Sequence, residues 1–381
     1  MTASEVDLKD LARSNVARVQ ARMVRDGVDA LVLAKNETTR YLTGYQRYFC
    51  ASYLPFVHAV VLLQDRGPYL LLPTHILKFG DRCHAEEVRL LPMDLEAQVE
   101  TILSLLRPLD RKGAKIGTEL DFMFAGFMRL LEAGLTNAAV VDSAPVMERV
   151  MAIKTPDELA LLTKSSNLND AVVRSIFEKA RPGVTELQLG AEAGIALGGG
   201  AEFINHLCIR SQENAFELGP INTARVLAEG DTLQLDTGFI YRGYVSDVNR
   251  TRVLGTPTQK QKDVIRTVVD VHADLMTMMK PGTRASDIYN RCLELFGRSA
   301  FRDDFRMPFI AHGIGMQLHE FPYVTPTNHA ELEAGMVIAL EPGIYVPGQG
   351  TCRMENVFVI TEDGYDMITD LPDDLELNGI S

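Results

Sequence analysis

The chain contains Gly230-Asp-Thr-Leu-Gln-Leu-Asp-Thr-Gly238, an apolar stretch that ends in an acid and a glycine. The same arrangement returns 105 positions later as Gly335-Met-Val-Ile-Ala-Leu-Glu-Pro-Gly343, and a gapless alignment puts Asp236 on Glu341. Short apolar runs bounded by glycine are typical of buried strands. The repeat therefore predicts two related strands, each with a carboxylate at its end.

Each copy is followed by a turn and a second acid. Arg242-Gly243 precedes Asp247 in the first copy, and Pro347-Gly348-Gln349-Gly350 precedes Glu355 in the second. Glycine and proline at such positions favour hairpin turns, so we expect two hairpins that carry two carboxylates each. Four convergent carboxylates repel one another unless cations lie between them.

Imidazoles lie between the two copies. His312 opens the segment His-Gly-Ile-Gly315, and His319 follows seven residues after His312. Carboxylate oxygens with a single imidazole suit Mn²⁺, Fe²⁺, Co²⁺ or Zn²⁺ at a hydrolytic site, whereas structural zinc needs more thiolate and imidazole. The pattern predicts a two-metal centre.

A longer repeat surrounds these motifs. A helix from Pro156 to about Lys179 precedes Pro182-Gly183, and a helix over about 258–279 precedes Pro281-Gly282. After each Pro-Gly we expect a further helix, over 186–197 and over 285–296. The order of helix, Pro-Gly, helix and carboxylate hairpin thus occurs twice, so two pseudo-equivalent halves would enclose one site.

The preceding part of the chain alternates helix and strand patterns. The patterns indicate a helix over 11–27, a buried strand over 28–34 and a hairpin over 59–72. Tyr41-Leu-Thr-Gly44 is expected to start a loop. We place the domain boundary between residues 145 and 146, which gives an α/β domain over 1–145 and a second domain over 146–381.

The composition limits the partners. The chain has 381 residues, of which 46% are hydrophobic and 23% charged, with a formal net charge of −13. Nucleic acid and anionic membrane surfaces require a basic footprint, so we expect neither as a partner. The N-terminus shows no secretory pattern and the five cysteines are scattered, which predicts cytoplasmic residence with reduced thiols.

These motifs together resemble the creatinase, prolidase, aminopeptidase P and methionine aminopeptidase superfamily. The resemblance rests on Leu-Asp236-Thr-Gly, Gly243-Tyr-Val-Ser-Asp247-Val-Asn-Arg-Thr251, His312-Gly-Ile-Gly, His319-Glu320, Leu-Glu341-Pro-Gly and Arg353-Met-Glu355. The N-terminal segment with Asp29-Ala-Leu-Val resembles the additional domain of creatinase and the proline-specific peptidases. The resemblance implies an α/β (α+β) fold, with a creatinase-like N-terminal domain and a C-terminal pita-bread domain that has an internal pseudo-two-fold repeat.

The resemblance also implies roles for seven residues. The metal ligands would be Asp236, Asp247, His312, Glu341 and Glu355, with Asp247 and Glu355 bridging two cations. Glu341 would also transfer the proton of a metal-activated water, and His319 would bind the substrate carbonyl. Arg353 would support the hydrogen-bond network around the ligands. Creatinase-like members have substitutions in this set and work without metal, whereas here the set is complete.

The implied function is hydrolysis of Xaa-Pro bonds, as an aminopeptidase or a dipeptidase, by a homodimer with two divalent ions, manganese foremost. One residue departs from the pattern, because Gly219 stands where many proline-specific members have a substrate-binding histidine. The alternatives are a small-molecule hydrolase or lyase, with creatinase-like or DMSP-lyase-like substrates, and a metal-free binding protein. The remaining histidines are interpreted as structural or surface residues: His58, His75, His84, His206, His272 and His329.

Overall fold

The computed structural model describes residues 2–3, 5–46, 58–74, 78, 82–216, 222–348, 350–371 and 379–380. The chain divides into two compact units, Ser4–Met151 and Ala152–Ser381, the latter joined by Met1–Ala3. Both units combine helices with strands and contain buried apolar cores. The expected mixed α/β class is therefore confirmed. Gly219, His75, Gln349 and Cys50, which figure in the sequence predictions, lie outside the described residues.

The first unit is built on a six-stranded sheet in the order β4-β3-β2-β1-β5-β6. Its elements are α1 Leu8–Asp26, β1 Ala30–Leu33, α2 Asn36–Thr43, β2 Ala59–Leu63, β3 Tyr69–Leu72, β4 Glu87–Leu90, α3 Leu95–Leu106, the 3₁₀ turn η2 Arg107–Leu109, β5 Lys115–Thr118, α4 Ala125–Gly134, β6 Ala139–Asp142 and α5 Ala144–Ala152. Strands β2 and β3 pair antiparallel, which confirms the hairpin over 59–72.

The prediction that a loop starts at Tyr41 is wrong. Residues 41–43 form the last turn of α2, and Gly44 ends that helix with φ at 70°. Glycine adopts this left-handed conformation without steric cost, so Gly44 is a helix C-cap and not the end of a loop. Tyr41 is buried, and its carbonyl accepts a hydrogen bond from Asn15 Nδ2 in α1.

The second unit contains two five-stranded sheets and one two-stranded ribbon. Its elements are α6 Pro156–Lys179, α7 Glu186–Leu189, η3 Gly190–Ala193, α8 Gly194–Gly198, β7 Phe203–Ser211, η4 Gln212–Phe216, β8 Thr232–Tyr241, β9 Tyr244–Val245, β10 Val248–Leu254, α9 Gln259–Met276, α10 Ala285–Gly297, β11 Ala311–Gly313, β12 Glu320–Tyr323, β13 Val337–Leu340, β14 Gly343–Val346, β15 Gly350–Arg353, β16 Asn356–Ile360, β17 Tyr365–Met367 and β18 Gly379–Ile380. Among the described helices, none is long and apolar enough to cross a bilayer.

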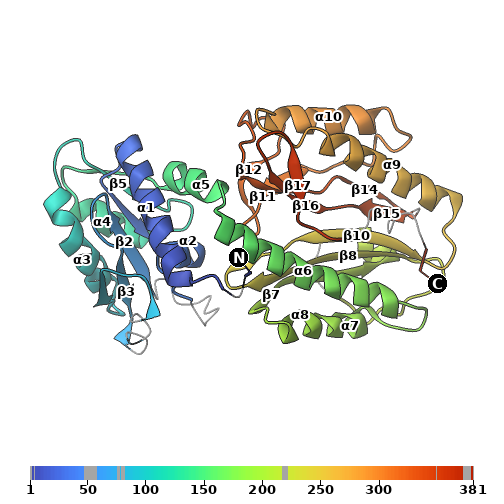
Figure 1. Ribbon diagram of the computed structural model, residues 1–381, viewed down its shortest axis with the longest axis horizontal. Coiled ribbons are helices and arrows are strands. Elements are labelled where there is room, and N and C mark those ends of the chain that lie inside the picture. Colours follow the sequence, from blue (N-terminus) through green and yellow to red (C-terminus); the bar gives the residue numbers. More distant parts are fainter. Residues whose placement is uncertain are drawn as a thin grey trace. The chain divides into compact units, whose positions relative to one another are not determined.

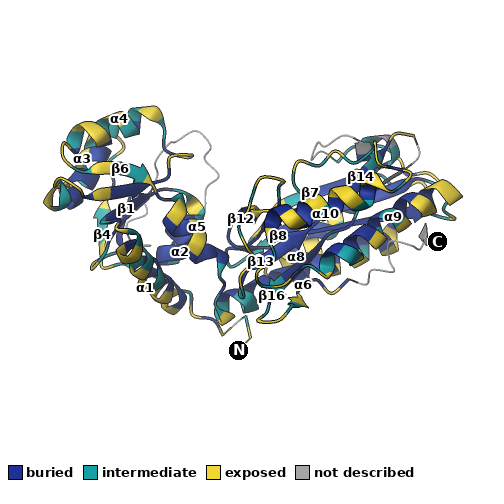
Figure 2. Ribbon diagram, turned by 90° about the horizontal axis from the view of Figure 1, so that it is seen from above, coloured by how far each residue is buried: buried dark blue, intermediate teal, exposed yellow. Residues whose placement is uncertain are grey.

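Helices cover the outer faces of the two sheets in the second unit. Helices α6, α7 and α8 lie against β7 and β8, while α9 and α10 lie on the side of β14, β15 and β16 (Figure 1). The strands are largely buried, and the exposed residues of α9 and α10 face outward (Figure 2). Each half thus has its own apolar core between helix and strand, and the inner faces of the strands are left for polar side chains.

The expected internal repeat is visible in how the two long helices begin and end. Thr155 and Thr258 form capping boxes at the starts of α6 and α9, each with the residue three positions on. After these helices, Gly183 and Gly282 have φ of 92° and 82°, which only glycine adopts readily. Two equivalent chain reversals therefore lead into the two carboxylate hairpins.

The prediction of a single helix over 186–197 is wrong in its continuity. The segment is broken into α7, the 3₁₀ turn η3 and α8, whereas its counterpart α10 is continuous. Gly190 and Gly194 stand at the two breaks. Glycine costs up to about 1 kcal/mol relative to alanine inside a helix, so two glycines four residues apart weaken a single continuous helix here.

Candidate metal centre

Strand β8 brings Asp236 to the inner face of the first half. Leu233, Leu235 and Phe239 point into the core beneath α6, and alternation along a strand sends Asp236 to the opposite face. Asp236 pairs with Asn249 of β10, and Asp247 lies just before that strand. The turn at Arg242-Gly243 has φ of 47° and 96°, so the expected hairpin and its two acids are present.

The second half places its acids at breaks between short strands. Glu341 lies between β13 and β14, and Glu355 lies between β15 and β16. Both side chains are fully buried. The amide of Glu355 donates to Asn249 O at 3.1 Å, and fully buried Arg250 donates to Glu355 O at 2.5 Å. These bonds hold Glu355 against the first half.

His312 stands on β11, which pairs antiparallel with β13. Its Nδ1 lies 3.0 Å from Gly313 O, which leaves Nε2 to face the acids. Nε2 is 3.5 Å from Glu341 Oε1 and 3.6 Å from Asp247 Oδ2. A Cβ at position 313 would lie 2.3 Å from Phe321 O, so glycine is needed where β12 crosses next to the histidine.

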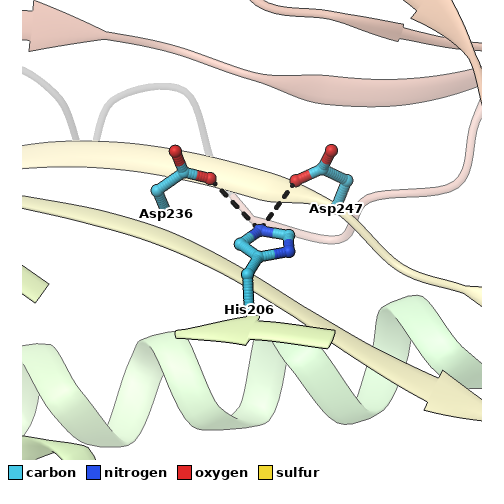
Figure 3. A group of neighbouring side chains, drawn as sticks. All are labelled: His206, Asp236 and Asp247. Atoms are coloured by element: carbon cyan, nitrogen blue, oxygen red, sulfur yellow. Dashed lines mark ion pairs between the residues drawn. The ribbon is translucent and has the colours of Figure 1, made fainter. Parts of the chain in front are cut away.

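His206, which the sequence pattern indicated as a structural or surface residue, lies within the site. Its Nε2 lies 3.2 Å from Asp236 Oδ1 and 3.2 Å from Asp247 Oδ1. The ring rises from β7 toward both aspartates (Figure 3). The sequence did contain one signal for the face on which His206 lies. Leu207 and Ile209 pack in the helix-side core, so His206, on the opposite face of β7, faces the acids.

Arg353 contacts two of the acids directly. Its Nη1 lies 3.3 Å from Asp236 Oδ2, and Nη2 forms an ion pair with Glu341. A second guanidinium, that of Arg210, lies 4.0 Å from the same oxygen of Asp236. The two arginines offset part of the negative charge that the acids concentrate here.

His319 lies at the edge of the cluster and is exposed. Its ring centroid is 4.2 Å from that of His312 and 5.5 Å from that of Phe309. Phe309 also lines a cavity of about 430 Å³. The cavity is lined by Arg306, Met307, Pro308, Phe309, Tyr345, Pro347 and Arg353. A mostly apolar hollow with a few polar groups beside a titratable cluster is typical of a small-molecule site.

Burial and neighbouring charges separate the pKa values of the cluster. Burial, then the charge of Asp247, raises the pKa of Glu355 well above its ordinary value. Burial also acts to raise the pKa of Asp236, but Arg353 and His206 outweigh it and hold that pKa below its usual range. Burial lowers the pKa of His312 to about 4, so its ring is neutral at pH 7, the form that binds metals. Burial would lower the pKa of His206 too, but Asp247 and Asp236 keep it well above normal.

The donor set fits divalent cations. Both carboxylate oxygens of Glu355, and Nε2 of His312, are buried without a hydrogen-bond partner among the described residues. Leaving such groups unpaired costs several kcal/mol unless a cation satisfies them, about 1–3 for each neutral group and more for a charge. Within the part of the chain that the structure describes, two groups of donors lie close enough to hold an ion, His206 with Asp236 and Asp247, and Asp247 with His312 and Glu355. Asp247 belongs to both groups.

Buried carboxylates and imidazoles around one point define a metal-dependent protein of two related halves. The chain belongs to the metallopeptidase family M24, whose model matches residues 160–362. The model of the creatinase/prolidase N-terminal domain matches residues 15–153. The resemblance drawn from the motifs is thereby confirmed, and the family is one of divalent-metal peptidases.

Known relatives match over almost the whole chain. The Xaa-Pro dipeptidase of Pyrococcus horikoshii is 26% identical over 365 residues, covering 94% of this chain and 98% of the relative. An uncharacterized peptidase of Bacillus subtilis, YqhT, is 26% identical over 358 residues, covering 92% and 96%. The crystal structure of the prolidase from Pyrococcus horikoshii OT3 superposes with a TM-score of 0.82 at 23% identity, covering 95% and 99%. This likeness establishes the two-domain fold.

Proposed function

We propose that the chain hydrolyses Xaa-Pro peptide bonds with two divalent cations, as an aminopeptidase or a dipeptidase. The observation that carries the proposal is that one carboxylate, Asp247, belongs to two donor groups on its two sides. The proposed ligands are Asp236, Asp247, His312, Glu341 and Glu355. Relatives named as Xaa-Pro dipeptidases, similar over more than nine-tenths of both chains, support the substrate class.

The proposed mechanism assigns separate tasks to the protein side chains. When bound, two divalent cations supply an activated water of lowered pKa and polarise the scissile carbonyl. Glu341 accepts a proton from the water and returns it to the leaving nitrogen, and its ion pair with Arg353 fixes the carboxylate for both transfers. His319 donates a hydrogen bond to the carbonyl oxygen as negative charge develops there.

The cavity beside the cluster supports binding of a short peptide. Arg353 belongs both to its lining and to the acid cluster, so a substrate held there would have its scissile bond next to Glu341. Phe309, which contacts the ring of His319, gives the cavity an apolar wall on the same side. A proline ring suits such a wall, because apolar contacts favour a rigid ring that has little conformational entropy to lose.

One sequence feature favours a second candidate function. Gly219 lacks the imidazole that many proline-specific relatives have at the corresponding position, so the same centre could serve a small-molecule hydrolase or lyase instead. Loss of one hydrogen bond to substrate costs on the order of 1 kcal/mol, or about fivefold to tenfold in kcat/KM. We therefore expect Xaa-Pro turnover to be weak or restricted to particular peptides.

A panel of dipeptides on the full-length protein tests the proposal. Apo-protein is reconstituted separately with Mn²⁺, Co²⁺, Fe²⁺ and Zn²⁺ and assayed on Xaa-Pro, Xaa-Ala and zwitterionic metabolites. We expect Xaa-Pro cleavage, greatest with Mn²⁺, and an increase in Gly219→His. Turnover of metabolites without any peptide cleavage by either protein would assign the second function.

We also propose that the protein is a cytoplasmic homodimer. The support for the dimer is the family resemblance. The net charge of −13 bears separately on partners, since it suits neither nucleic acid nor an anionic membrane surface. Light scattering of the purified protein tests the dimer, and a monomeric mass across micromolar concentrations would contradict it.

A further inference from the structure

We propose that His206 is a sixth protein ligand of this centre and binds the same cation as Asp236. The inference rests on the two-cation site proposed above. Its first support is position, since His206 Nε2 lies 3.2 Å from an oxygen of each aspartate (Figure 3). The three side chains form one of the two groups of donors that lie close enough to share an ion.

The distances agree with shared coordination. Two ligand atoms that each lie about 2.1 Å from one cation are about 3.0 Å apart at a right angle and about 3.4 Å apart at the tetrahedral angle. The two separations measured from His206 Nε2, both 3.2 Å, fall between these values. A single cation could therefore contact His206 and both aspartates without a rearrangement of the strands.

A register shift in β7 orients the imidazole of His206 toward the aspartates. The register between β7 and β8 shifts between Ile204 and His206, so Asn205 is an extra residue opposite β8. Such a bulge re-aims the side chain that follows it, and bulges are frequent beside active sites. Past the bulge His206 pairs with Gly238, which lies two residues from Asp236 and on the same face of β8.

Gly238 provides the space for the imidazole. A Cβ at this position would lie 2.4 Å from His206 Cε1 and 2.5 Å from Ser246 O, far inside contact distance. The φ of Gly238 is not positive, so the glycine is required by packing and not by backbone conformation. The absence of a side chain at position 238 thus allows the ring to reach the aspartates.

The consequence is a nitrogen ligand on each side of Asp247. His312 faces Asp247 Oδ2 and His206 faces Asp247 Oδ1, so each cation would have one imidazole. Imidazole ligands favour Co²⁺ and Zn²⁺ more than Mg²⁺ or Ca²⁺, because nitrogen is a softer donor than carboxylate oxygen. The cation beside Asp236 would therefore be held more tightly than by oxygen ligands alone.

A purely structural role is the competing explanation. In that case His206 would only donate a hydrogen bond to Asp236 or Asp247, and another donor of similar reach would replace it. Glutamine at position 206 distinguishes the two, because its amide can donate to a carboxylate but is a much poorer metal ligand than imidazole. Alanine removes both abilities.

The test is a titration of metal-free, full-length protein with Co²⁺. Calorimetry measures the affinities, and visible absorption records the Co²⁺ spectrum. Wild type should bind two ions, and His206→Ala and His206→Gln should each bind one of them at least about tenfold more weakly, with an altered Co²⁺ spectrum. His329→Ala is the matched control, since His329 contacts Ser286 Oγ away from the acids and should leave both ions and the spectrum unchanged.

Two results would overturn the inference. Wild-type affinities and spectrum in His206→Ala would show that His206 is no ligand, and wild-type behaviour in His206→Gln alone would show a hydrogen-bonding role. Failure of the wild type to bind two ions would refute the two-cation site itself. Circular dichroism of both variants checks folding, and the glutamine variant retains the polar contacts if alanine destabilises the strand.

Discussion

Oδ2 of Asp247 lies 3.6 Å from Nε2 of His312, longer than a hydrogen bond but short enough for one cation to contact both atoms. The other oxygen of this carboxylate faces His206 in the same way. Asp247 is thereby the single side chain common to the two donor groups. Its substitution should have consequences that substitution of Asp236, which belongs to one group, does not have.

His319→Ala should lower kcat by about 100-fold and leave the metal content at the wild-type level. The reason is that His319 stands at the exposed edge of the cluster, 4.2 Å from the His312 ring between centroids, where it can reach substrate. Steady-state kinetics and elemental analysis of the same preparation measure both quantities. Loss of metal in this variant would mean that His319 and His312 have exchanged roles.

Lys154→Met should lower the free energy of unfolding by roughly 3–5 kcal/mol. Lys154 Nζ lies 2.8 Å from Glu320 Oε2, and both side chains are buried, at 1% and 6% exposure. Glu320 also accepts from Gln317 N, so the pair anchors the loop that carries His319. Without the lysine, an uncompensated carboxylate stays buried.

The double variant Lys154→Met/Glu320→Leu is the control for this ion pair. Removal of both charges should recover most of the lost stability, since no unpaired charge remains. Urea unfolding monitored by circular dichroism gives the free energies. Wild-type stability in the single variant, or no recovery in the double variant, would contradict the role assigned to the pair.

The free energy of unfolding of the wild type should fall as the pH rises from 5 to 7, and Asp170→Asn should make this fall smaller. Burial raises the pKa of Asp170 from 3.8 to about 6, and its Oδ2 accepts from Asp370 N at 2.7 Å. Between pH 3.8 and about pH 6, Asp170 therefore keeps its proton in the folded chain but has lost it in the unfolded chain, and this difference stabilises the folded chain. This stabilisation is complete below pH 3.8 and is lost as the pH rises through 6.

The expected difference for Asp170 is about 1 kcal/mol between the two pH values. Urea unfolding of wild type and Asp170→Asn at pH 5 and pH 7 measures it, and asparagine retains an oxygen that can accept from Asp370 N. An equal pH dependence in the two proteins would show that Asp170 is ionised in the folded chain throughout this range.

The local sequence pattern was sufficient to predict the internal repeat of helices, turns and carboxylate hairpins in the second unit. The hairpins at Arg242-Gly243 and after Glu341 and the turn at Gly183 depend on neighbouring residues, and each is observed. The acids follow from the same pattern because each hairpin has one acid before its turn and one after it. Within 186–197 the pattern failed, because glycines at positions 190 and 194 outweighed the helical spacing.

Strand alternation indicates the face of β7 on which His206 lies, but its contact with the two aspartates could not be predicted from local sequence. Its approach to Asp236 depends on a shift of register between β7 and β8 and on the space that Gly238 leaves across the strand pair. Both are properties of paired strands, whose register is set by packing and not by local sequence. The contact of Arg353 with both Glu341 and Asp236 has the same origin, since Arg353 lies on β15, Asp236 on β8 and Glu341 between β13 and β14.

The metal content of Asp247→Asn compared with Asp236→Asn tests the two-cation centre most directly. Metal-free wild type, both variants and the His329→Ala control are loaded with Mn²⁺, freed of excess by gel filtration and analysed for metal and chain concentration. We predict about two ions per chain in wild type, about one in Asp236→Asn and close to none in Asp247→Asn. One ion or fewer in wild type, or equal losses in the two variants, would contradict this prediction.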